Sequence, residues 1–246
     1  MNTATEPKLP PHVLDHFAAF ESPWRRRRHQ FYLGWKRLMW RWLIGGAHFT
    51  KRALDIVGSG CALIGLAPVF ALIGLLIKCE DRGPIVFCQV RVGRHGREFK
   101  MLKFRSMRVD AEAVRAALLA ANQHGQQGVT FKMKRDPRIT PVGRLIRRTS
   151  IDELPQLWCI LRGDMSLVGP RPPLPSEVAR YTLADRERLL VTPGLTCIWQ
   201  VSGRSEVPFP QQVQMDLDYI RAPGLWADLK LLLKTLPAVI RGHGAY

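Results

Sequence analysis

The chain has 246 residues and a hydrophobic content of 46%, which is enough for one large domain with its own core. Lys and Arg number 37 against 20 Asp and Glu, which gives a formal net charge of +17. The expected partners are therefore polyanions: nucleic acid, anionic lipid or phosphorylated substrates. The 5 cysteines are odd in number, widely spaced and free of C-x-x-C pairs, so they suggest neither a disulfide framework nor a zinc site.

Residues 1–48 are predicted to form a basic and aromatic N-terminal extension. The segment from Trp24 to Arg52 contains no acid and mixes arginine and lysine with tryptophan, tyrosine and phenylalanine. This composition suits a lipid headgroup layer, where aromatic rings lie at the interface and cations meet anionic lipid. It would also suit a nucleic-acid-binding arm whose aromatic rings stack on bases.

An uncharged run of 22 residues, 56–77, is long enough to cross a bilayer as a straight helix. Pro68 lies near its middle, where proline breaks a helix. Basic residues flank the run on both sides, and the positive-inside rule places both flanks in the cytoplasm. The sequence therefore favours a re-entrant membrane helix over residues 49–80, with a single crossing as the alternative. Ser59, or packing against the domain, is expected to satisfy the carbonyl that the break frees.

Residues 81–246 are predicted to form a compact α+β domain that is mainly helical. Two β-rich runs, 85–92 and 97–104, are joined by Gly93-Arg94-His95-Gly96, which predicts a β-hairpin. The Gly- and Pro-rich segments 163–173 and 193–203 predict irregular loops. Helices are predicted over residues 110–122, 177–190, 211–221 and 225–240. The last of these is amphipathic and suits either the domain core or a membrane surface.

The stretch 147–157 places two adjacent acids, Asp152 and Glu153, shortly after a pair of arginines. Ser150-x-x-Glu153 fits a capping box at a helix start, but Pro155 would then lie too far into the helix. Moving the N-cap one or two residues later tolerates Pro155 and leaves Asp152 at the helix mouth. A helix N-terminus beside arginines is an anion site. The acid there is either a structural cap or a nucleophile for a phosphorus centre.

Five motifs occur along the chain in a fixed order: Lys103-Phe104-Arg105-Ser106-Met107, Asp136-Pro137-Arg138-Ile139-Thr140, and the segments 150–157, 163–172 and 193–203. In this order they resemble the bacterial sugar transferases, which are monotopic polyprenyl-phosphate phosphoglycosyl transferases. The resemblance covers roughly residues 49–246, and the segment 233–239 is similar to the exopolysaccharide-synthesis branch. Most members break the membrane helix at Ser-Pro, whereas this chain has Ala67-Pro68.

The resemblance implies transfer of a hexose-1-phosphate from a UDP-sugar, UDP-glucose or UDP-galactose, to undecaprenyl phosphate, with release of UMP. It implies that Asp152 attacks the β-phosphorus and carries a covalent phospho-sugar ester, and that Glu153 is associated with Mg²⁺. The reaction would take place at the cytoplasmic face of the bacterial inner membrane. It would be the first membrane step of exopolysaccharide synthesis.

The resemblance also implies a set of cationic substrate-binding residues, which would neutralise the phosphates during transfer. They are Lys103, Arg105, Arg147, Arg171 and Arg204. Asp216 matches a functionally important acid of the family, and Pro68 matches the break in the membrane helix. For each arginine the alternative is an ordinary salt bridge.

The expected partners are a UDP-sugar, undecaprenyl phosphate and membrane lipid, with no nucleic acid, while a homo-oligomer stays open. Two other classes of function remain as alternatives. One is a non-catalytic, membrane-attached protein that binds nucleic acid or lipid through residues 24–52. The other is a metal-dependent nucleotide-sugar hydrolase in which water is the acceptor.

Overall fold

The structure is a computed structural model in which residues 23–111, 136–203 and 206–241 are described. The helix predicted at 110–122 therefore lies almost wholly outside the described residues. The chain divides into two compact units, Met1–Lys51 and Arg52–Tyr246. The described elements are mainly helical and include a small antiparallel β-hairpin, as the sequence predicts.

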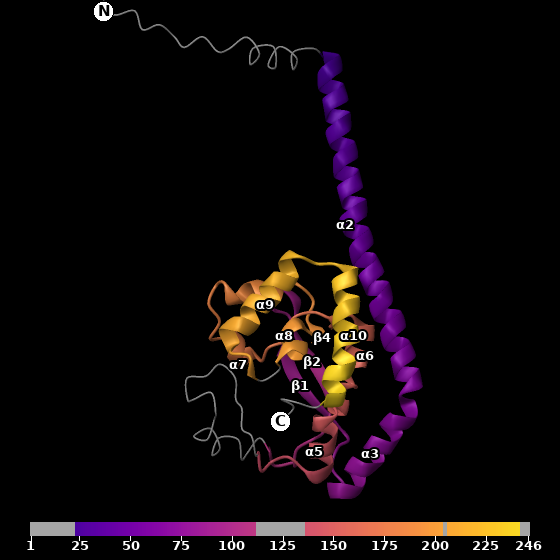
Figure 1. Cartoon of the computed structure of the whole chain (residues 1–246), viewed down its shortest axis with the longest axis vertical. Coiled ribbons are helices and arrows are strands. Elements are labelled where there is room, and N and C mark those ends of the chain that lie inside the picture. Colours follow the sequence, from indigo (N-terminus) through magenta and orange to yellow (C-terminus); the bar gives the residue numbers. More distant parts are fainter. Residues whose placement is uncertain (1–22, 112–135, 204–205, 242–246) are drawn as a thin grey trace, which may run out of the picture. The chain divides into compact units, whose positions relative to one another are not determined.

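Helix α2 runs from Pro23 to Gly65 (Figure 1). Within the first unit it exposes large aromatic side chains, among them Trp24 and Tyr32. A cation one turn further along the helix lies over each of these two rings. The Arg28 guanidinium carbon is 5.9 Å from the centre of the Trp24 ring, and Lys36 Nζ is 4.8 Å from that of Tyr32. The basic and aromatic side chains of the extension thus pair with each other on a helix surface.

The apolar run is broken where Pro68 predicts. Helix α3 (Ala67–Asp81) has Pro68 in its first turn, where the missing N–H costs nothing. Among the described residues no single helix is long and apolar enough to cross a membrane, but Phe49–Gly65 and Ala67–Asp81 together meet that test across a 60° bend. Ser59 does not bind the backbone carbonyl that the break frees, because its hydroxyl donates to the Asp55 carbonyl at 2.5 Å instead.

The predicted hairpin is confirmed. Strands β1 (Val86–Val92) and β2 (Glu98–Phe104) pair antiparallel, from Val86 opposite Phe104 to Val92 opposite Glu98. The connection is the 3-10 turn η1 (Arg94–Gly96), in which His95 and Gly96 have positive φ angles of 56° and 77°. A glycine at the second of these positions avoids the steric cost that a Cβ would bring.

The segment that follows β2 is held by the residues before α5 (Pro141–Arg148). Thr140 donates its N–H to the Ser106 carbonyl at 3.2 Å, and its hydroxyl accepts from Gly143 N at 2.9 Å as the N-cap of α5. A Cβ on Gly143 would lie 2.0 Å from the Ser106 carbonyl oxygen, so only glycine fits this approach. Two motifs that are far apart in the sequence therefore fold together and fix the direction of α5.

The acid pair lies in the 3-10 turn η3 (Ile151–Glu153), and α6 (Gln156–Arg162) begins after it with Pro155 as N-cap. The predicted helix start at residue 151 or 152 is therefore wrong. Ser150 adopts the left-handed conformation, with φ 55° and ψ 17°. The chain consequently reverses after α5 and makes a separate turn before α6 can start.

Both segments predicted to be irregular contain a short strand. Strands β3 (Ser166–Val168) and β4 (Gly194–Thr196) pair in parallel. The glycines that suggested loops allow the close approach of the two chains instead, since a Cβ on Gly194 would lie 2.0 Å from Gly169 N. Three-residue strands are too short to show a period in the sequence.

The predicted helix at 177–190 is wrong as well. It is replaced by one helical turn, α7 (Pro175–Val178), and by the 3-10 helix η4 (Asp185–Leu190). Within this segment Arg188 is buried against Asp216. Helices α9 (Phe209–Arg221) and α10 (Leu225–Arg241) form close to the predicted positions.

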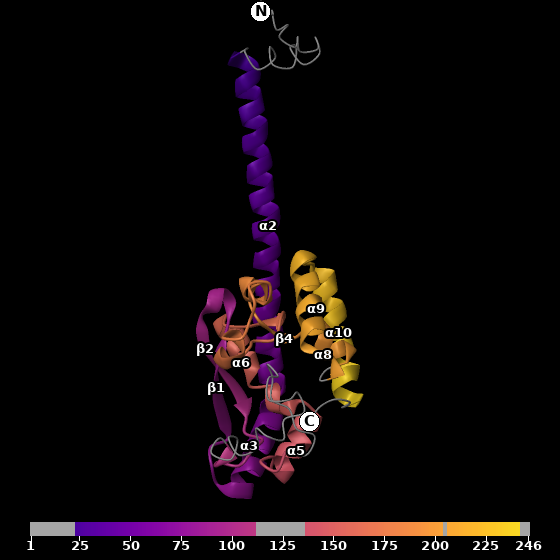
Figure 2. The same cartoon turned by 90° about the vertical axis from the view of Figure 1, so that its left-hand side faces the viewer.

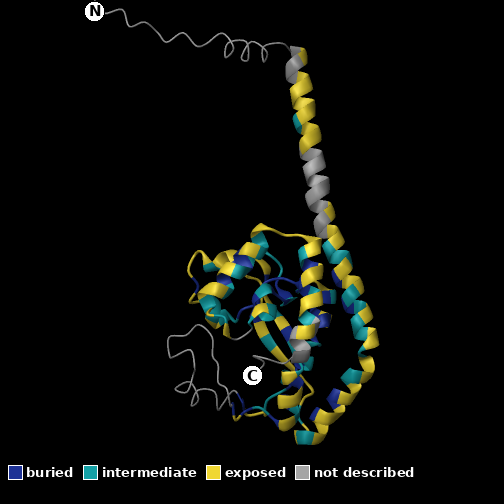
Figure 3. Ribbon diagram, viewed as in Figure 1, coloured by how far each residue is buried: buried dark blue, intermediate teal, exposed yellow. Residues whose placement is uncertain are grey.

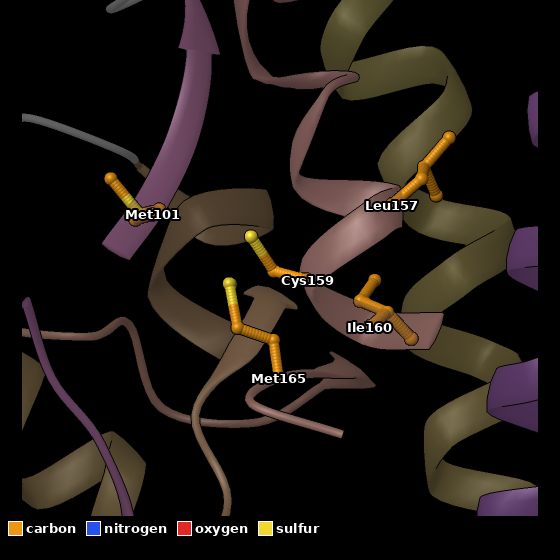
Figure 4. Close-up of a cluster of buried hydrophobic side chains, with 5 residues drawn as sticks. All are labelled: Met101, Leu157, Cys159, Ile160 and Met165. Atoms are coloured by element: carbon orange, nitrogen blue, oxygen red, sulfur yellow. The ribbon is translucent and has the colours of Figure 1, made fainter. Parts of the chain in front are cut away.

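Helix α8 (Ile198–Ser202) contacts both α9 and α10, and the three lie on the opposite side of this unit from the hairpin (Figure 2). Buried residues gather in the middle of the domain, around α6 and the short strands (Figure 3). One cluster joins β2, α6 and the start of β3, where Cys159 and Met165 point toward each other (Figure 4). Its members are Met101, Leu157, Cys159, Ile160 and Met165.

The bent helix pair contributes to this core rather than lying apart from it. Leu63 of α2 and Leu66, at the break between the two helices, pack against the first cluster, and Ile73 and Ile77 of α3 form a second cluster with Phe104 and Ile146. Each fully buried side chain of this size contributes about 1.5–3 kcal/mol to stability. The pair is therefore an integral part of the domain that carries the acid pair.

Candidate active site

Glu153 faces an open recess and is paired with a cation. Its Oε1 accepts a hydrogen bond from Lys103 Nζ at 2.7 Å, across 50 residues of sequence. Burial raises the pKa of Glu153, but Lys103 and Arg171 outweigh it and lower the pKa to about 2. This carboxylate is therefore ionised at every physiological pH. The recess is lined by Met101, Lys103, Glu153, Gln156, Arg171, Pro172, Gly194, Leu195 and Gln200.

Asp152 lies beside the recess, and only 8% of its surface is exposed. Burial raises its pKa to about 6, the charge of Glu153 adds to this, and Lys103 and Arg147 oppose it. No side chain in the described part of the chain forms a hydrogen bond or ion pair with it. At neutral pH a carboxyl with this pKa is still mostly ionised.

Arg147, in the last turn of α5, is a cation whose charge favours the ionised form of Asp152. Burial lowers its pKa, while the charges of Asp152 and Asp136 oppose that effect. Asp136 in turn holds Arg138 in a buried ion pair, with 2.6 Å between Oδ2 and Nη2. The Nη1 of Arg147 is buried without a hydrogen-bond partner among the described residues. A buried, unpaired donor near two carboxylates is a candidate partner for a phosphate oxygen.

Arg171 reaches the recess from the loop after β3, and that loop is fixed by β1. The buried Arg91 donates from Nη1 to the Pro172 carbonyl at 3.0 Å, and Val92 N donates to the Pro173 carbonyl at 2.9 Å. Burial and the charge of Arg171 lower the pKa of Arg91 to about 10. Sequence reasoning missed Arg91, because an arginine in a β-rich run indicates a solvated position. Gln156 and Gln200, which line the recess, were also missed, because no sequence pattern sets these glutamines apart.

The structure therefore brings together Lys103, Arg147 and Arg171 around the acid pair. Arg105 lies elsewhere: it is ion-paired with Asp81 at the end of α3 and packs over Gly83. A Cβ on Gly83 would lie 1.9 Å from Arg105 Nη1, so a larger residue there would have to displace the guanidinium group. Arg204 lies outside the described residues.

The family model for the bacterial sugar transferases matches residues 46–242. The chain belongs to this family. The match includes the bent helix pair, the hairpin, the acid pair and the three C-terminal helices.

Several bacterial sugar transferases are similar to most of the chain. The galactosyl transferase CpsE of Streptococcus agalactiae is 48% identical over 199 residues, which are 80% of this chain and 43% of CpsE. The exopolysaccharide production protein ExoY of Sinorhizobium fredii is 41% identical over 205 residues, or 82% of this chain and 90% of ExoY. The UDP-glucose:undecaprenyl-phosphate glucose-1-phosphate transferase of Caulobacter vibrioides is 39% identical over 204 residues, or 80% of this chain and 72% of that protein. The chain spans less than half of the length of several relatives that it matches.

In this bacterial sugar transferase Asp216 lies inside the protein. Only 1% of its surface is exposed, and its Oδ2 is 2.5 Å from Arg188 Nη2. Burial raises the pKa of Asp216 to about 6, while Arg188 and the Trp199 indole oppose the shift. Arg188 also lies over the rings of Tyr181 and Phe209, at 5.8 and 5.7 Å. Asp216 interacts with Trp199, and the next residue of α8, Gln200, lines the recess. Asp216 therefore lies behind one wall of the recess rather than in it.

Replacing Arg188 by Met is expected to destabilise the domain by about 3–5 kcal/mol, because the buried Asp216 loses its partner. The loss should shrink as the pH falls from 7 to 5, since protonation of Asp216 removes the unpaired charge. Urea unfolding in detergent micelles at several pH values measures both effects. The variant Arg188→Met with Asp216→Asn is the control and should lack the pH response. Equal pH responses in the two variants would contradict this account.

The donors at the site suit a magnesium ion. Among the described residues no cluster of three or more His, Cys, Asp or Glu side chains is arranged to hold a metal. Magnesium, however, is commonly held by one or two carboxylates together with water and substrate phosphates. The adjacent carboxylates of Asp152 and Glu153 meet that requirement, and only one oxygen of Glu153 is engaged by Lys103.

Proposed function

We propose that this bacterial sugar transferase moves a hexose-1-phosphate from UDP-glucose or UDP-galactose to undecaprenyl phosphate. UMP is released, the product is undecaprenyl-diphosphate-sugar, and the reaction is the first membrane step of exopolysaccharide synthesis. The names of the relatives support both sugars and the polyprenyl acceptor. The observation that carries the proposal is the unequal pairing of two adjacent acids: Glu153 is paired with Lys103, whereas Asp152 has no side-chain partner among the described residues.

The unequal pairing supports different roles for the two acids. An Asp152 oxygen attacks the β-phosphorus of the UDP-sugar, the bond from that phosphorus to the bridging oxygen breaks, and UMP leaves. The aspartyl phospho-sugar ester then meets undecaprenyl phosphate, whose phosphate oxygen attacks the same phosphorus and returns Asp152 to its carboxylate. Splitting the transfer in this way lets a water-soluble and a lipid substrate react in turn at one site.

The cations of the recess are suited to hold the diphosphate. Arg171 and Lys103 line the recess, and Arg147 offers a buried donor beside Asp152. Such charges stabilise the phosphoryl group in the transition state more than in the ground state. Glu153, with the phosphate oxygens, would hold Mg²⁺. When bound, that ion would supply further neutralisation of the pyrophosphate and of the leaving UMP.

The rate of ester formation should follow the ionisation of Asp152. Because burial raises the pKa of this carboxyl to about 6, the ionised nucleophile predominates above that pH. The single-turnover rate of UMP release is therefore expected to be half-maximal near pH 6, to rise as pH increases, and to level off above pH 7. Glu153 stays ionised throughout. A rate that falls between pH 6 and 7 would rule out Asp152 as the titrating nucleophile.

The same proposal places the enzyme at the cytoplasmic face of the bacterial inner membrane. The outer side of the bent helix pair exposes large apolar side chains, including Ile64, Leu72 and Leu75 at 79%, 56% and 61%. Further exposed apolar side chains occur on α6 and α10, including Trp158 and Trp226. Large apolar side chains exposed together on a protein surface mark sites of membrane or protein interaction. A re-entrant insertion over residues 49–80 would cover it with lipid.

Accessibility labelling tests this topology. In a variant from which the native cysteines have been removed, Gln30→Cys and Arg97→Cys are expected to react with a membrane-impermeant maleimide only from the cytoplasmic side. Pro68→Leu should straighten the pair, since it restores the missing N–H donor, and should move one of the two labels to the other side. Labels on opposite sides in the chain that retains Pro68 would show a single crossing.

The activity is tested by UMP release from membranes that contain the enzyme, undecaprenyl phosphate and one UDP-sugar at a time. Sustained UMP release with UDP-glucose or UDP-galactose, dependent on the acceptor lipid, is the expected result. Sustained release of free sugar phosphate without acceptor would instead identify a nucleotide-sugar hydrolase. Membrane attachment with no UMP release from any UDP-sugar would leave a binding protein.

A further inference from the structure

One face of α2 carries polar side chains into the domain. Arg52, Asp55 and Ser59 are spaced three and four residues apart, so they share that face. Asp55 and Ser59 are buried, with 5% and 0% of their surfaces exposed. Asp55 comes just before the apolar run 56–77, and a buried carboxylate costs free energy unless it has partners. The contacts of this face reach more than 100 residues along the sequence.

Arg52 caps the C-terminal end of α6. Its Nη1 donates to the Ile160 carbonyl at 2.6 Å, and its Nη2 donates to the Leu161 carbonyl at 2.8 Å. The last carbonyls of a helix have no partner within the helix, and a cation there also complements the helix dipole. Helix α6 starts three residues after Glu153 and has only seven residues, so fixing its end also fixes the turn that precedes it.

Asp55 holds the beginning of β3. Its Oδ1 accepts from Ser166 Oγ at 3.1 Å and from Leu167 N at 2.9 Å. The fit is close on this side of α2, because a Cβ on Gly58 would lie 3.0 Å from Leu167 Cδ1. Strand β3 leads directly into the loop that carries Arg171. One helix face therefore forms hydrogen bonds to two separate segments, α6 and β3, and each of them leads to residues of the recess.

We propose that Arg52 and Asp55 are positioning residues for the transfer, which hold Glu153 and Arg171 in place through α6 and β3. They touch neither substrate nor the reacting atoms. This inference rests on the proposed function, and it makes the helix that precedes the bend part of the catalytic framework. A displacement of about 1 Å at a reacting centre can cost on the order of 100-fold in rate. Loss of the hydrogen bonds of either residue should therefore slow the chemical step more than it weakens binding of the UDP-sugar.

Four variants test the proposal: Arg52→Met, which keeps the apolar stem but loses the donors, Arg52→Lys, Asp55→Ala and Asp55→Asn. Asparagine keeps a carbonyl oxygen for both Asp55 contacts, so it should rescue the alanine variant. We expect single-turnover UMP release by Arg52→Met and Asp55→Ala to slow by about 10- to 100-fold, with the KM for the UDP-sugar changed less than about threefold. Asp55→Asn should stay within about threefold of the unmodified enzyme. Arg52→Lys should lie between Arg52→Met and the unmodified enzyme.

The matched controls are Arg108→Met and Asp110→Ala, which break an ion pair of the same chemistry that is largely exposed. Hydrogen–deuterium exchange of the same proteins gives a readout that does not depend on activity. Arg52→Met should speed exchange in 151–162, and Asp55→Ala should speed it in 166–173, while the hairpin stays unchanged. Unchanged rates and exchange, or a uniform rise in exchange with an unchanged single-turnover rate, would overturn the proposal. If the unmodified enzyme releases no UMP, the proposed function fails, and local exchange alone decides whether the two residues hold these segments.

Discussion

Replacing Asp152 by Asn is expected to lower the formation of undecaprenyl-diphosphate-sugar by at least about 1,000-fold. An amide is a poor nucleophile toward phosphorus. The carboxylate among the described residues that line the recess is Glu153, and its pairing with Lys103 at 2.7 Å holds it in place. Steady-state assays with UDP-glucose or UDP-galactose measure the loss. Binding of the UDP-sugar should be retained, because the cations of the recess are unchanged.

Glu153→Gln is the matched comparison for this variant. It removes the neighbouring charge and leaves Asp152 in place, so turnover should slow without losing the covalent ester. Its Mg²⁺ dependence should change, since Glu153 is the proposed metal ligand. If Glu153→Gln abolished the ester and Asp152→Asn did not, the assignment of the two acids would be reversed.

Replacing Lys103 by Met is expected to lower activity at pH 7 by about 100- to 1,000-fold, a typical loss when one preorganised stabilising charge is removed. Lys103 lowers the pKa of both Asp152 and Glu153. Its loss should raise both values, so less Asp152 is ionised at neutral pH. The midpoint of the pH–rate profile should therefore move above about pH 6, and activity should recover partly at higher pH.

Lys103→Arg, which keeps a positive charge, should lose less activity and should shift the midpoint little. Lys100→Met is the second control, because Lys100 lies on the same strand with an exposed side chain. A midpoint that moved to lower pH in Lys103→Met would contradict the electrostatic role given to this lysine.

Local rules were sufficient for some features of the fold. The hairpin followed from two β-rich runs around a glycine-bounded turn, and the bend followed from Pro68 within an apolar run. The acid pair was identified from its sequence neighbours and the family motifs. In each case the deciding residues lie within a few positions of one another.

Other features depend on contacts between distant segments. Strands β3 and β4 have three residues each and exist because two glycines allow their chains to meet. The segment predicted as a helix at 177–190 instead buries Arg188 against Asp216 of α9. The separation of the pKa values of the acids depends on burial and on Lys103, which comes 50 positions before Glu153. No pattern within a short window contains this information.

The central claim is that Asp152 carries the phospho-sugar, and intact-protein mass spectrometry tests it most directly. The enzyme is incubated with UDP-glucose or UDP-galactose and Mg²⁺ in the absence of undecaprenyl phosphate, and the product is digested to locate any modification. The expected result is one hexose phosphate per chain on Asp152, lost on addition of the acceptor lipid and absent from Asp152→Asn. An adduct on another residue, or steady-state kinetics that require both substrates bound together, would contradict the account.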